Sequence, residues 1–171
     1  MSQRPITIDA DASPSGYIAW YNHHTETSRI RTVRPAPRNE RFGVQRMELL
    51  AIYFALCDNL AEIRRALKTK QRLAIQVRSD SKSTVEQLQG TSEIRDSMMR
   101  RIVSAIGKLL TRMASCTIAF DHLERSKNIA GLMLEQRQRR ERERMMEMLA
   151  ARMFPPASPM QSPPVVVLSF A

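Results

Sequence analysis

The first 34 residues alternate between apolar and polar positions with the period of two that is typical of β-strands. This alternation predicts strands over residues 5–11, 17–22 and 27–34. The segment "SPSG" that follows the first strand predicts a turn, and "PAPRNE" ends the third strand. Three strands joined by short loops predict an antiparallel meander.

A helical period replaces this alternation from residue 44 onward. Apolar residues recur at spacings of three and four over residues 44–60, and the stripe is wide enough to predict a mostly buried helix. Residues 72–80 predict a fourth strand, and residues 81–90 predict a short helix that starts at Ser81 and stops at Gly90. An amphipathic helix is predicted over 92–113. Its predicted inward positions are Ile94, Met98, Ile102, Ile106, Leu109 and Met113.

The rest of the chain predicts a strand over 115–123 and a long helix over 128–153. The predicted order is therefore β-β-β-α-β-α-α-β-α. Because helices separate the fourth and fifth strands, these two strands can pair in parallel. The pattern predicts an α/β domain with a mixed five-stranded sheet and helices on both faces.

Composition changes along the chain and divides it into three parts. Residues 1–134 carry the predicted sheet and its helices. Residues 135–153 form a charged helical extension, in which opposite charges recur four residues apart, as in Glu135 and Arg139. Residues 154–171 are rich in proline and predict a disordered tail.

The chain is strongly basic. Among its 171 residues, Lys and Arg number 27 and Asp and Glu number 17, which gives a formal net charge of +10. This excess favours a polyanionic partner, with nucleic acid ahead of an anionic membrane. The alternative is a basic protein whose charge serves only its solubility.

The lack of a recognisable targeting signal and the type of cysteine usage predict an intracellular, cytoplasmic protein. The start of the sequence shows no signal peptide, and no apolar segment reaches the length of about 20 residues that spans a bilayer. Cys57 and Cys116 lie in apolar segments without the spacing of a zinc site, which predicts buried thiols in a reducing compartment.

Three acidic residues lie where a sheet edge would gather them. Asp11 ends the first predicted strand, Asp80 ends the fourth, and Glu48 lies near the start of an otherwise apolar helix. A buried carboxylate is unfavourable unless it is paired or bound to a cation. Converging carboxylates predict a hard, oxygen-ligated metal ion, Mg²⁺ or Mn²⁺.

Four segments, in this order, resemble the type 1 ribonuclease H family. They are "ITIDADASPSGYIAW" at 6–20, "RMELLAIYFAL" at 46–56, "VRSDSKSTV" at 77–85 and "HLERSKNIAGLML" at 122–134. The second is the most specific of them. The resemblance implies a ribonuclease H-like fold.

The resemblance also implies a site and an activity. It makes Asp11, Glu48 and Asp80 metal ligands, and it implies an endonuclease that hydrolyses the RNA strand of RNA–DNA hybrids with two divalent ions. The alternatives are a non-catalytic nucleic-acid-binding module on the same fold and a related nuclease that acts on DNA or single strands. A protein partner that binds through residues 135–153 is a further alternative.

One departure from the family bears on activity. The family places a fourth Asp on its last helix, in an Asn-x-x-Ala-Asp or similar pattern, whereas here Gly131 follows Ala130. Either Glu135 reaches back from the next turn, or Asp9 substitutes from the first strand, or the second metal is held weakly. The last alternative would reduce or abolish activity.

Other candidate residues come with a functional and a structural interpretation. The resemblance implies that His122 assists catalysis, and a local hydrogen bond is the favoured alternative. Ser13 and Asn128 are candidates for hybrid contacts, or for a turn and a helix cap. Arg46 belongs to a cluster of arginines that either contacts phosphates or forms a solvated face. The other members of this cluster are Arg29, Arg31, Arg34, Arg38 and Arg41.

Overall fold

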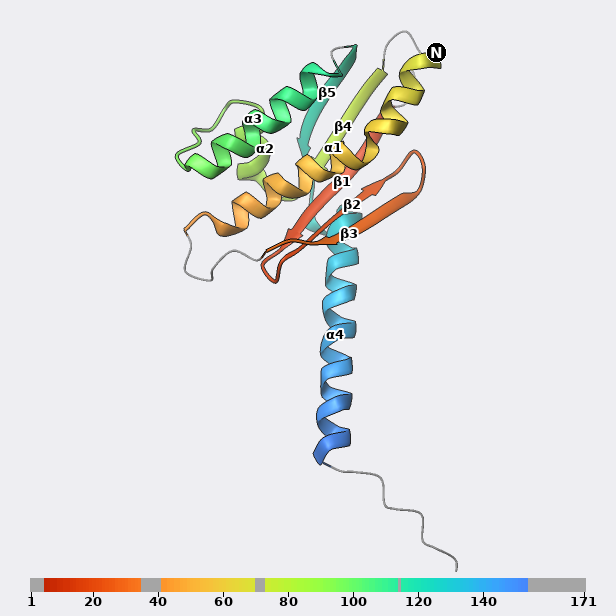
Figure 1. The fold of residues 1–171 in the computed structure, drawn as a ribbon, viewed down its shortest axis with the longest axis vertical. Coiled ribbons are helices and arrows are strands. Elements are labelled where there is room, and N and C mark those ends of the chain that lie inside the picture. The colour runs from red at the N-terminus through yellow and green to blue at the C-terminus, as the bar shows by residue number, and fades with distance from the viewer. Residues whose placement is uncertain (1–4, 35–40, 70–72, 114, 154–171) are drawn as a thin grey trace, which may run out of the picture. The chain divides into compact units, whose positions relative to one another are not determined.

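The structure is a computed structural model, and it describes residues 5–34, 41–69, 73–113 and 115–153. The predicted tail at 154–171 and the segment "PAPRNE" lie outside these residues. Five strands form one sheet in the order β3-β2-β1-β4-β5 (Figure 1). The pairs β1–β2 and β2–β3 are antiparallel, whereas β1–β4 and β4–β5 are parallel. The predicted element order and the mixed five-stranded sheet are both confirmed.

The bounds of the strands lie close to the predicted ones. β1 covers Ile6–Ser13, β2 covers Tyr17–Asn22 and β3 covers Thr27–Thr32, while β4 covers Leu73–Ser79 and β5 covers Cys116–His122. β1 alternates as a strand must, with Ile6, Ile8 and Ala10 on the face that packs against α1. Asp9 and Asp11 therefore share the opposite face.

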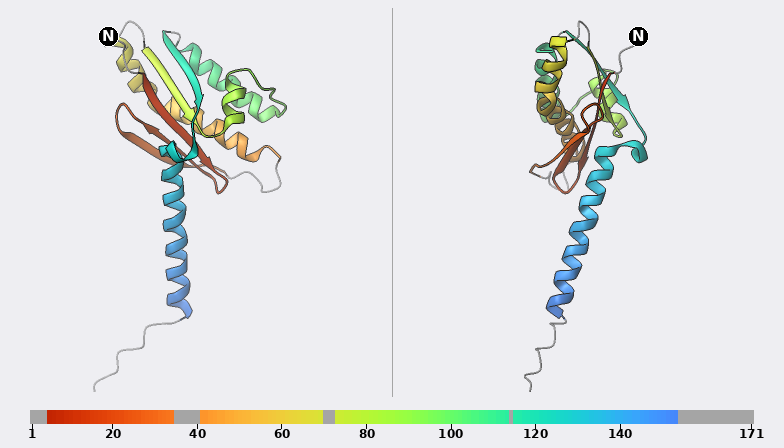
Figure 2. Two further views of the ribbon diagram at one scale, coloured as in Figure 1. Left: turned by 180° about the vertical axis from the view of Figure 1, so that it is seen from behind. Right: turned by 90° about the vertical axis from the view of Figure 1, so that its right-hand side faces the viewer.

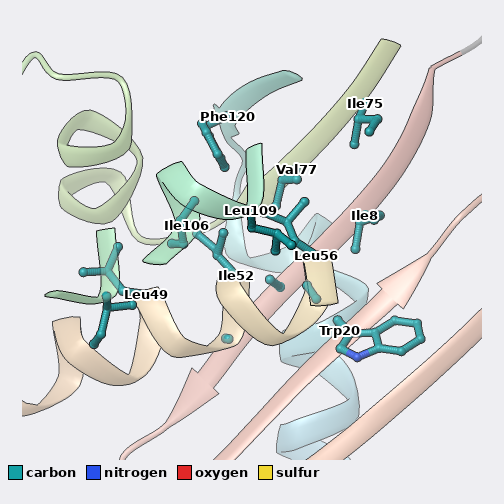
Figure 3. Packing of buried hydrophobic residues seen from close by; sticks show 14 of the residues in the cluster. Ile8, Trp20, Leu49, Ile52, Leu56, Ile75, Val77, Ile106, Leu109 and Phe120 are labelled. Carbon is teal, nitrogen blue, oxygen red and sulfur yellow. The ribbon is translucent and has the colours of Figure 1, made fainter. Parts of the chain in front are cut away.

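α1 covers Gly43–Thr69 and is longer than predicted. Its apolar stripe continues past Leu60 because Ile63 is buried and Ala66 and Leu67 pack against the same core. Figures 1 and 2 show α1 and α3 side by side on one face of the sheet. Figure 3 shows the core that lies between these two helices and the strands, including Ile52, Leu56, Val77 and Ile106.

α3 covers Ser97–Thr111, so the prediction that this helix begins at residue 92 is wrong. The Asp96 side chain accepts a hydrogen bond from the backbone N–H of Met99, and this cap fixes the first turn. The predicted inward residues Ile102, Ile106 and Leu109 are buried, and the stripe differs from the prediction in the first turn of the helix. Met99 is therefore buried, and the predicted inward residue Met98 is exposed.

α2 covers Lys82–Leu88, and the glycine that was predicted to stop it, Gly90, directly follows the C-cap residue Gln89. Gly90 adopts a left-handed conformation with φ of 75°. Its N–H donates to the carbonyl of Gln87, and the N–H of Thr91 donates to the carbonyl of Glu86. These two bonds form the Schellman motif that closes many helices at a glycine.

A short 3₁₀ turn at Arg125–Lys127 joins β5 to α4, which covers Ile129–Met153. Ala130 and Leu134 in its first turns pack against Ala19 of β2, on the sheet face opposite α1. Helices therefore lie on both faces, as predicted. In the described part of the chain, no helix combines the length and the apolar composition that a bilayer crossing requires.

Candidate metal centre

Three carboxylates from distant parts of the chain meet where β1 and β4 end. Asp11 lies near the end of β1, Asp80 directly follows β4, and Glu48 lies in the second turn of α1. One oxygen from each carboxylate lies within 4.8 Å of the other two. Parallel pairing of β1 with β4 places their carboxyl ends at one edge of the sheet, and α1 packs across β1. The fold therefore assembles a compact acidic cluster.

Burial and the neighbouring acidic charges make Asp11 and Glu48 hard to ionise. Burial and the neighbouring charge of Asp80 raise the pKa of Asp11 to about 7. Burial, followed by the charges of Asp11 and Asp80, raises the pKa of Glu48 well above its ordinary value. A hydrogen bond from the backbone of Ala12 lowers both pKa values, but by less. The cluster is thus unfavourable as three free anions.

The chemistry of this cluster fits a divalent cation. The Oε2 atom of Glu48 is buried and has no hydrogen-bond partner among the described residues. A cation would supply the missing partner and offset the repulsion between the carboxylates. Carboxylate oxygens are the ligands that Mg²⁺ and Mn²⁺ prefer. Asp11, Glu48 and Asp80 are therefore the residues that would hold such an ion.

Asn128 fastens the start of α4 to this cluster. Its fully buried side chain donates from Nδ2 to the carbonyl of Ala10, at 3.3 Å, and to Oδ1 of Asp80, at 3.4 Å. Its Oδ1 atom accepts a hydrogen bond from the backbone N–H of Gly131. Asn128 therefore caps α4 and orients Asp80 from inside the protein.

Gly131 lies directly against Asp11. A Cβ atom at this position would lie 2.8 Å from Oδ2 of Asp11, which is closer than such atoms approach. The spacing from Asn128 also shows which residue takes the place of the fourth Asp. In the Asn-x-x-Ala-Asp pattern, Gly131 stands at the Ala position and Leu132 stands at the Asp position. The fourth Asp is therefore missing at residue 132, one residue later than the sequence analysis placed it. The exposed side chain of Leu132 provides no carboxylate.

Asp9 is engaged away from the three-carboxylate cluster. Arg78 donates to its Oδ1 at 2.7 Å, and His23 Nε2 lies 2.8 Å from its Oδ2. The backbone N–H of Ile129 also donates to Oδ2. Asp9 shares a face with Asp11, as the strand period predicts, but its charge is already compensated. Its contacts hold α4 against β1 and do not suit a replacement ligand.

Glu135 is likewise engaged elsewhere. Its Oε1 atom accepts a hydrogen bond from Nε of Arg125 at 3.0 Å and forms an ion pair with Nη2 of the same residue at 2.9 Å. Arg125 in turn lies near the cluster, since its positive charge lowers the pKa of both Asp11 and Glu48. Neither alternative for a fourth ligand, Asp9 or Glu135, has a free carboxylate in this arrangement.

His122 lies next to Asp80 on the neighbouring strand. It pairs with Ser79 across β4 and β5, and its exposed ring hydrogen-bonds through Nε2 to the backbone carbonyl of Asp80, at 3.2 Å. This bond is the local hydrogen bond that the sequence analysis gave as the alternative to a role in catalysis. The ring of His122 also lies beside Asp80, so a role in catalysis stays a prediction.

The other residues that were predicted to contact nucleic acid bind side chains of the protein itself. The buried hydroxyl of Ser13 hydrogen-bonds with Ser15 in the turn after β1. Arg46 forms a two-pronged ion pair with Asp96, at 2.9 and 2.6 Å. Arg31 and Arg29 of the predicted phosphate-binding cluster both pair with Asp58. These guanidinium groups therefore fasten elements of the fold together.

The sequence did not predict the roles that two residues have near the cluster. Arg125 is a cation beside three acids, and Gly131 provides the space that Asp11 occupies. A glycine in the first turn of a helix is a signal of close approach, because glycine otherwise weakens a helix. Nothing in the local sequence distinguishes Arg125 from the many other arginines.

Comparisons with known proteins place this geometry on a known fold. No protein-family profile matches the chain, and no curated protein sequence does. Ribonuclease H1 from the halophilic archaeon Halobacterium salinarum superposes with a TM-score of 0.57 and 20% identity, over 74% of this chain and 91% of that one. The N-terminal RNase H domain of a Mycobacterium tuberculosis protein gives 0.53 and 15%, over 74% and 86%.

A third structure is LC11-RNase H1 in complex with an RNA/DNA hybrid. It superposes with a TM-score of 0.50 and 19% identity, over 72% of this chain and 87% of that one. At identities this low, the likeness establishes the fold. The chain therefore has the fold of type 1 ribonuclease H structures, as the sequence predicted.

Proposed function

We propose that this protein is a divalent-metal-dependent endonuclease that hydrolyses the RNA strand of RNA–DNA hybrids. The observation that carries the proposal is the cluster of Asp11, Glu48 and Asp80 at the strand ends of a ribonuclease H fold. The net charge of +10 supports a polyanionic substrate. One solved structure of this fold holds an RNA/DNA hybrid, which supports the choice of substrate class.

Each residue around the cluster has a proposed role. Asp11, Glu48 and Asp80 hold the cation, which when bound lowers the pKa of water and stabilises charge on a phosphodiester. Asn128 keeps Asp80 in place through its buried hydrogen bond. Arg125, which Glu135 orients, provides a positive charge for a substrate phosphate at the edge of the cluster. His122 is the candidate for a proton transfer beside Asp80.

The test is cleavage of an end-labelled hybrid with Mg²⁺ or Mn²⁺. We expect cleavage of the RNA strand by the wild-type protein, and no cleavage above the EDTA background by Asp80→Asn. Glu62→Gln, which removes a carboxylate on α1 outside the cluster, serves as the matched control and retains activity. Equal rates for wild type and Asp80→Asn would overturn the proposal.

A second candidate function is a non-catalytic hybrid-binding module. The observation that favours it is the missing fourth acid, because Leu132 has no carboxylate and Asp9 and Glu135 are both paired. This candidate predicts hybrid binding without turnover under any divalent ion. Comparing hybrid, double-stranded DNA and double-stranded RNA also separates it from a nuclease with another substrate.

A further inference from the structure

α3 presents a basic surface without a single acid. Arg100, Arg101, Lys108 and Arg112 lie within residues 97–112, where there is no Asp or Glu, and all four are exposed. By contrast, α1 carries Glu48, Asp58 and Glu62, α2 carries Glu86, and α4 carries several glutamates. The charges on the outer face of α3 therefore add up instead of cancelling.

The cations on this face are available to a ligand. Arg100 donates a hydrogen bond to the backbone carbonyl of Ile94 and is bound there to no carboxylate among the described residues. For Arg101, Lys108 and Arg112 no carboxylate partner is found in the described part of the chain. Elsewhere in the domain, in contrast, Arg31, Arg46, Arg78 and Arg125 are bound to carboxylates.

The same face is hollowed and carries hydroxyl groups. A shallow depression of about 430 Å³ is lined by Ser97, Arg100, Arg101, Ser104, Ala105 and Lys108. Guanidinium, ammonium and hydroxyl donors are the groups that bind phosphate oxygens without regard to base sequence. An acidic protein partner would also need apolar anchors, and the side chains that line this depression offer almost none.

The position of α3 relates this surface to the metal centre. The ion pair of Arg46 with Asp96 joins the start of α3 to α1, two residues before Glu48. At about 1.5 Å per residue, the 15 residues of α3 extend about 22 Å, or about six base pairs at about 3.4 Å each. The start of α3 therefore lies beside the start of α1, the helix that carries Glu48.

From these observations we infer that the outer face of α3 is a second nucleic-acid surface, which binds the phosphate backbone of the duplex beyond the cleaved segment. The inference rests on the proposed function for its ligand. It assigns α3 the binding of backbone, and leaves the chemistry to the metal centre.

The test compares two double variants of equal charge change. Arg101→Gln with Lys108→Gln alters α3, and Arg64→Gln with Lys68→Gln removes two exposed cations near the end of α1. Binding to a hybrid of about 24 base pairs is measured by fluorescence anisotropy in EDTA, over a series of salt concentrations. Each lost phosphate contact lowers the slope of log affinity against log salt by about 0.9.

We expect the α3 variant to lose about two units of slope and the α1 variant to keep the wild-type slope. Equal slopes for both variants, or binding to anionic lipid vesicles in preference to the duplex, would overturn the inference. Because EDTA prevents cleavage, the result does not depend on hydrolysis. A protein that binds through α3 but never cleaves would overturn the proposed function alone.

Discussion

Asp11 is destabilising in the absence of a cation. Its pKa of about 7 lies above the value of about 3.9 in an unfolded chain, so between these pH values the folded state binds an extra proton. Stability of the metal-free protein therefore falls as the pH rises through this range. We predict that Asp11→Asn raises the unfolding temperature in EDTA at about pH 8, although it removes a carboxylate of the proposed metal site.

The gain should become small at about pH 5, where Asp11 is protonated in the folded wild type. Thermal unfolding of both proteins at the two pH values measures this difference. An Asn variant that is less stable than the wild type at about pH 8 would show that the carboxylates do not repel one another as described.

Gly131 and Gly107 allow steric fit to be separated from helix propensity. Each lies in a helix, but a Cβ at Gly131 meets Asp11 at 2.8 Å, whereas a Cβ at Gly107 meets nothing within 4 Å. We predict that Gly107→Ala stabilises the protein by about 0.5–1 kcal/mol. Gly131→Ala should displace the Asp11 carboxylate and reduce the Mn²⁺-induced rise in unfolding temperature.

The readout is the unfolding temperature of each variant with and without Mn²⁺. The metal-induced rise of Gly107→Ala should equal that of the wild type. An undiminished rise in Gly131→Ala would mean that Asp11 yields to the new methyl group without loss of metal binding.

Among the elements, α1 and the hairpin of β2 and β3 are joined by one carboxylate. Asp58 on α1 accepts hydrogen bonds from Trp20 of β2 and Arg31 of β3. Burial opposes its ionisation, but the hydrogen bonds from Arg31 and Trp20 outweigh burial and hold the pKa of Asp58 below its ordinary value. The stabilisation is present above about pH 4 and is lost as the pH falls through the lowered pKa.

We predict that Asp58→Ala lowers the free energy of unfolding by about 2–3 kcal/mol, because it leaves Arg31 and the Trp20 N–H unpaired. Glu62→Ala, which removes an exposed pair with Arg65, should cost less than about 1 kcal/mol. Urea unfolding at neutral pH gives both values. Equal losses would show that Asp58 contributes no more than a surface carboxylate.

At the scale of the whole molecule, contacts divide the chain between Arg137 and Gln138. The guanidinium of Arg137 stacks on Tyr17 and belongs to the first unit. The second unit exposes several large apolar side chains on α4. These are Met145, Met146, Met148, Leu149 and Met153. A protein partner for this segment stays a prediction.

We predict that a chain ending at Arg137 keeps the unfolding temperature of the full chain and the hybrid cleavage that we propose for it. The reason is that all three carboxylates, their supporting residues and the hydrophobic core lie before residue 138. Differential scanning calorimetry and the cleavage assay check this. A marked loss of stability would show that residues 138–171 contribute to the fold of the first unit.

The sequence alone determined the order of the helices and strands, and it identified the three acidic residues that the fold brings together. Periods of two and of about 3.6 residues are local properties, and they predicted the strands of the sheet and the helices α1, α3 and α4. Cap residues predicted α2, and the 3₁₀ turn at Arg125–Lys127 was not predicted. Strand ends converge at one edge in any parallel pair, which predicted that Asp11 and Asp80 would lie together. The periods did not give the first residue of α3, because the Asp96 cap sets where this helix begins.

Tertiary structure decided which of the other polar residues have partners. Asp9 and Asp11 are equivalent by period, but Arg78 from β4 and His23 after β2 bind only the first of them. Glu135 pairs with Arg125, and Arg46 pairs with Asp96 from a segment 50 residues away. Such pairings depend on which elements pack together, and a local pattern of residues does not contain that information.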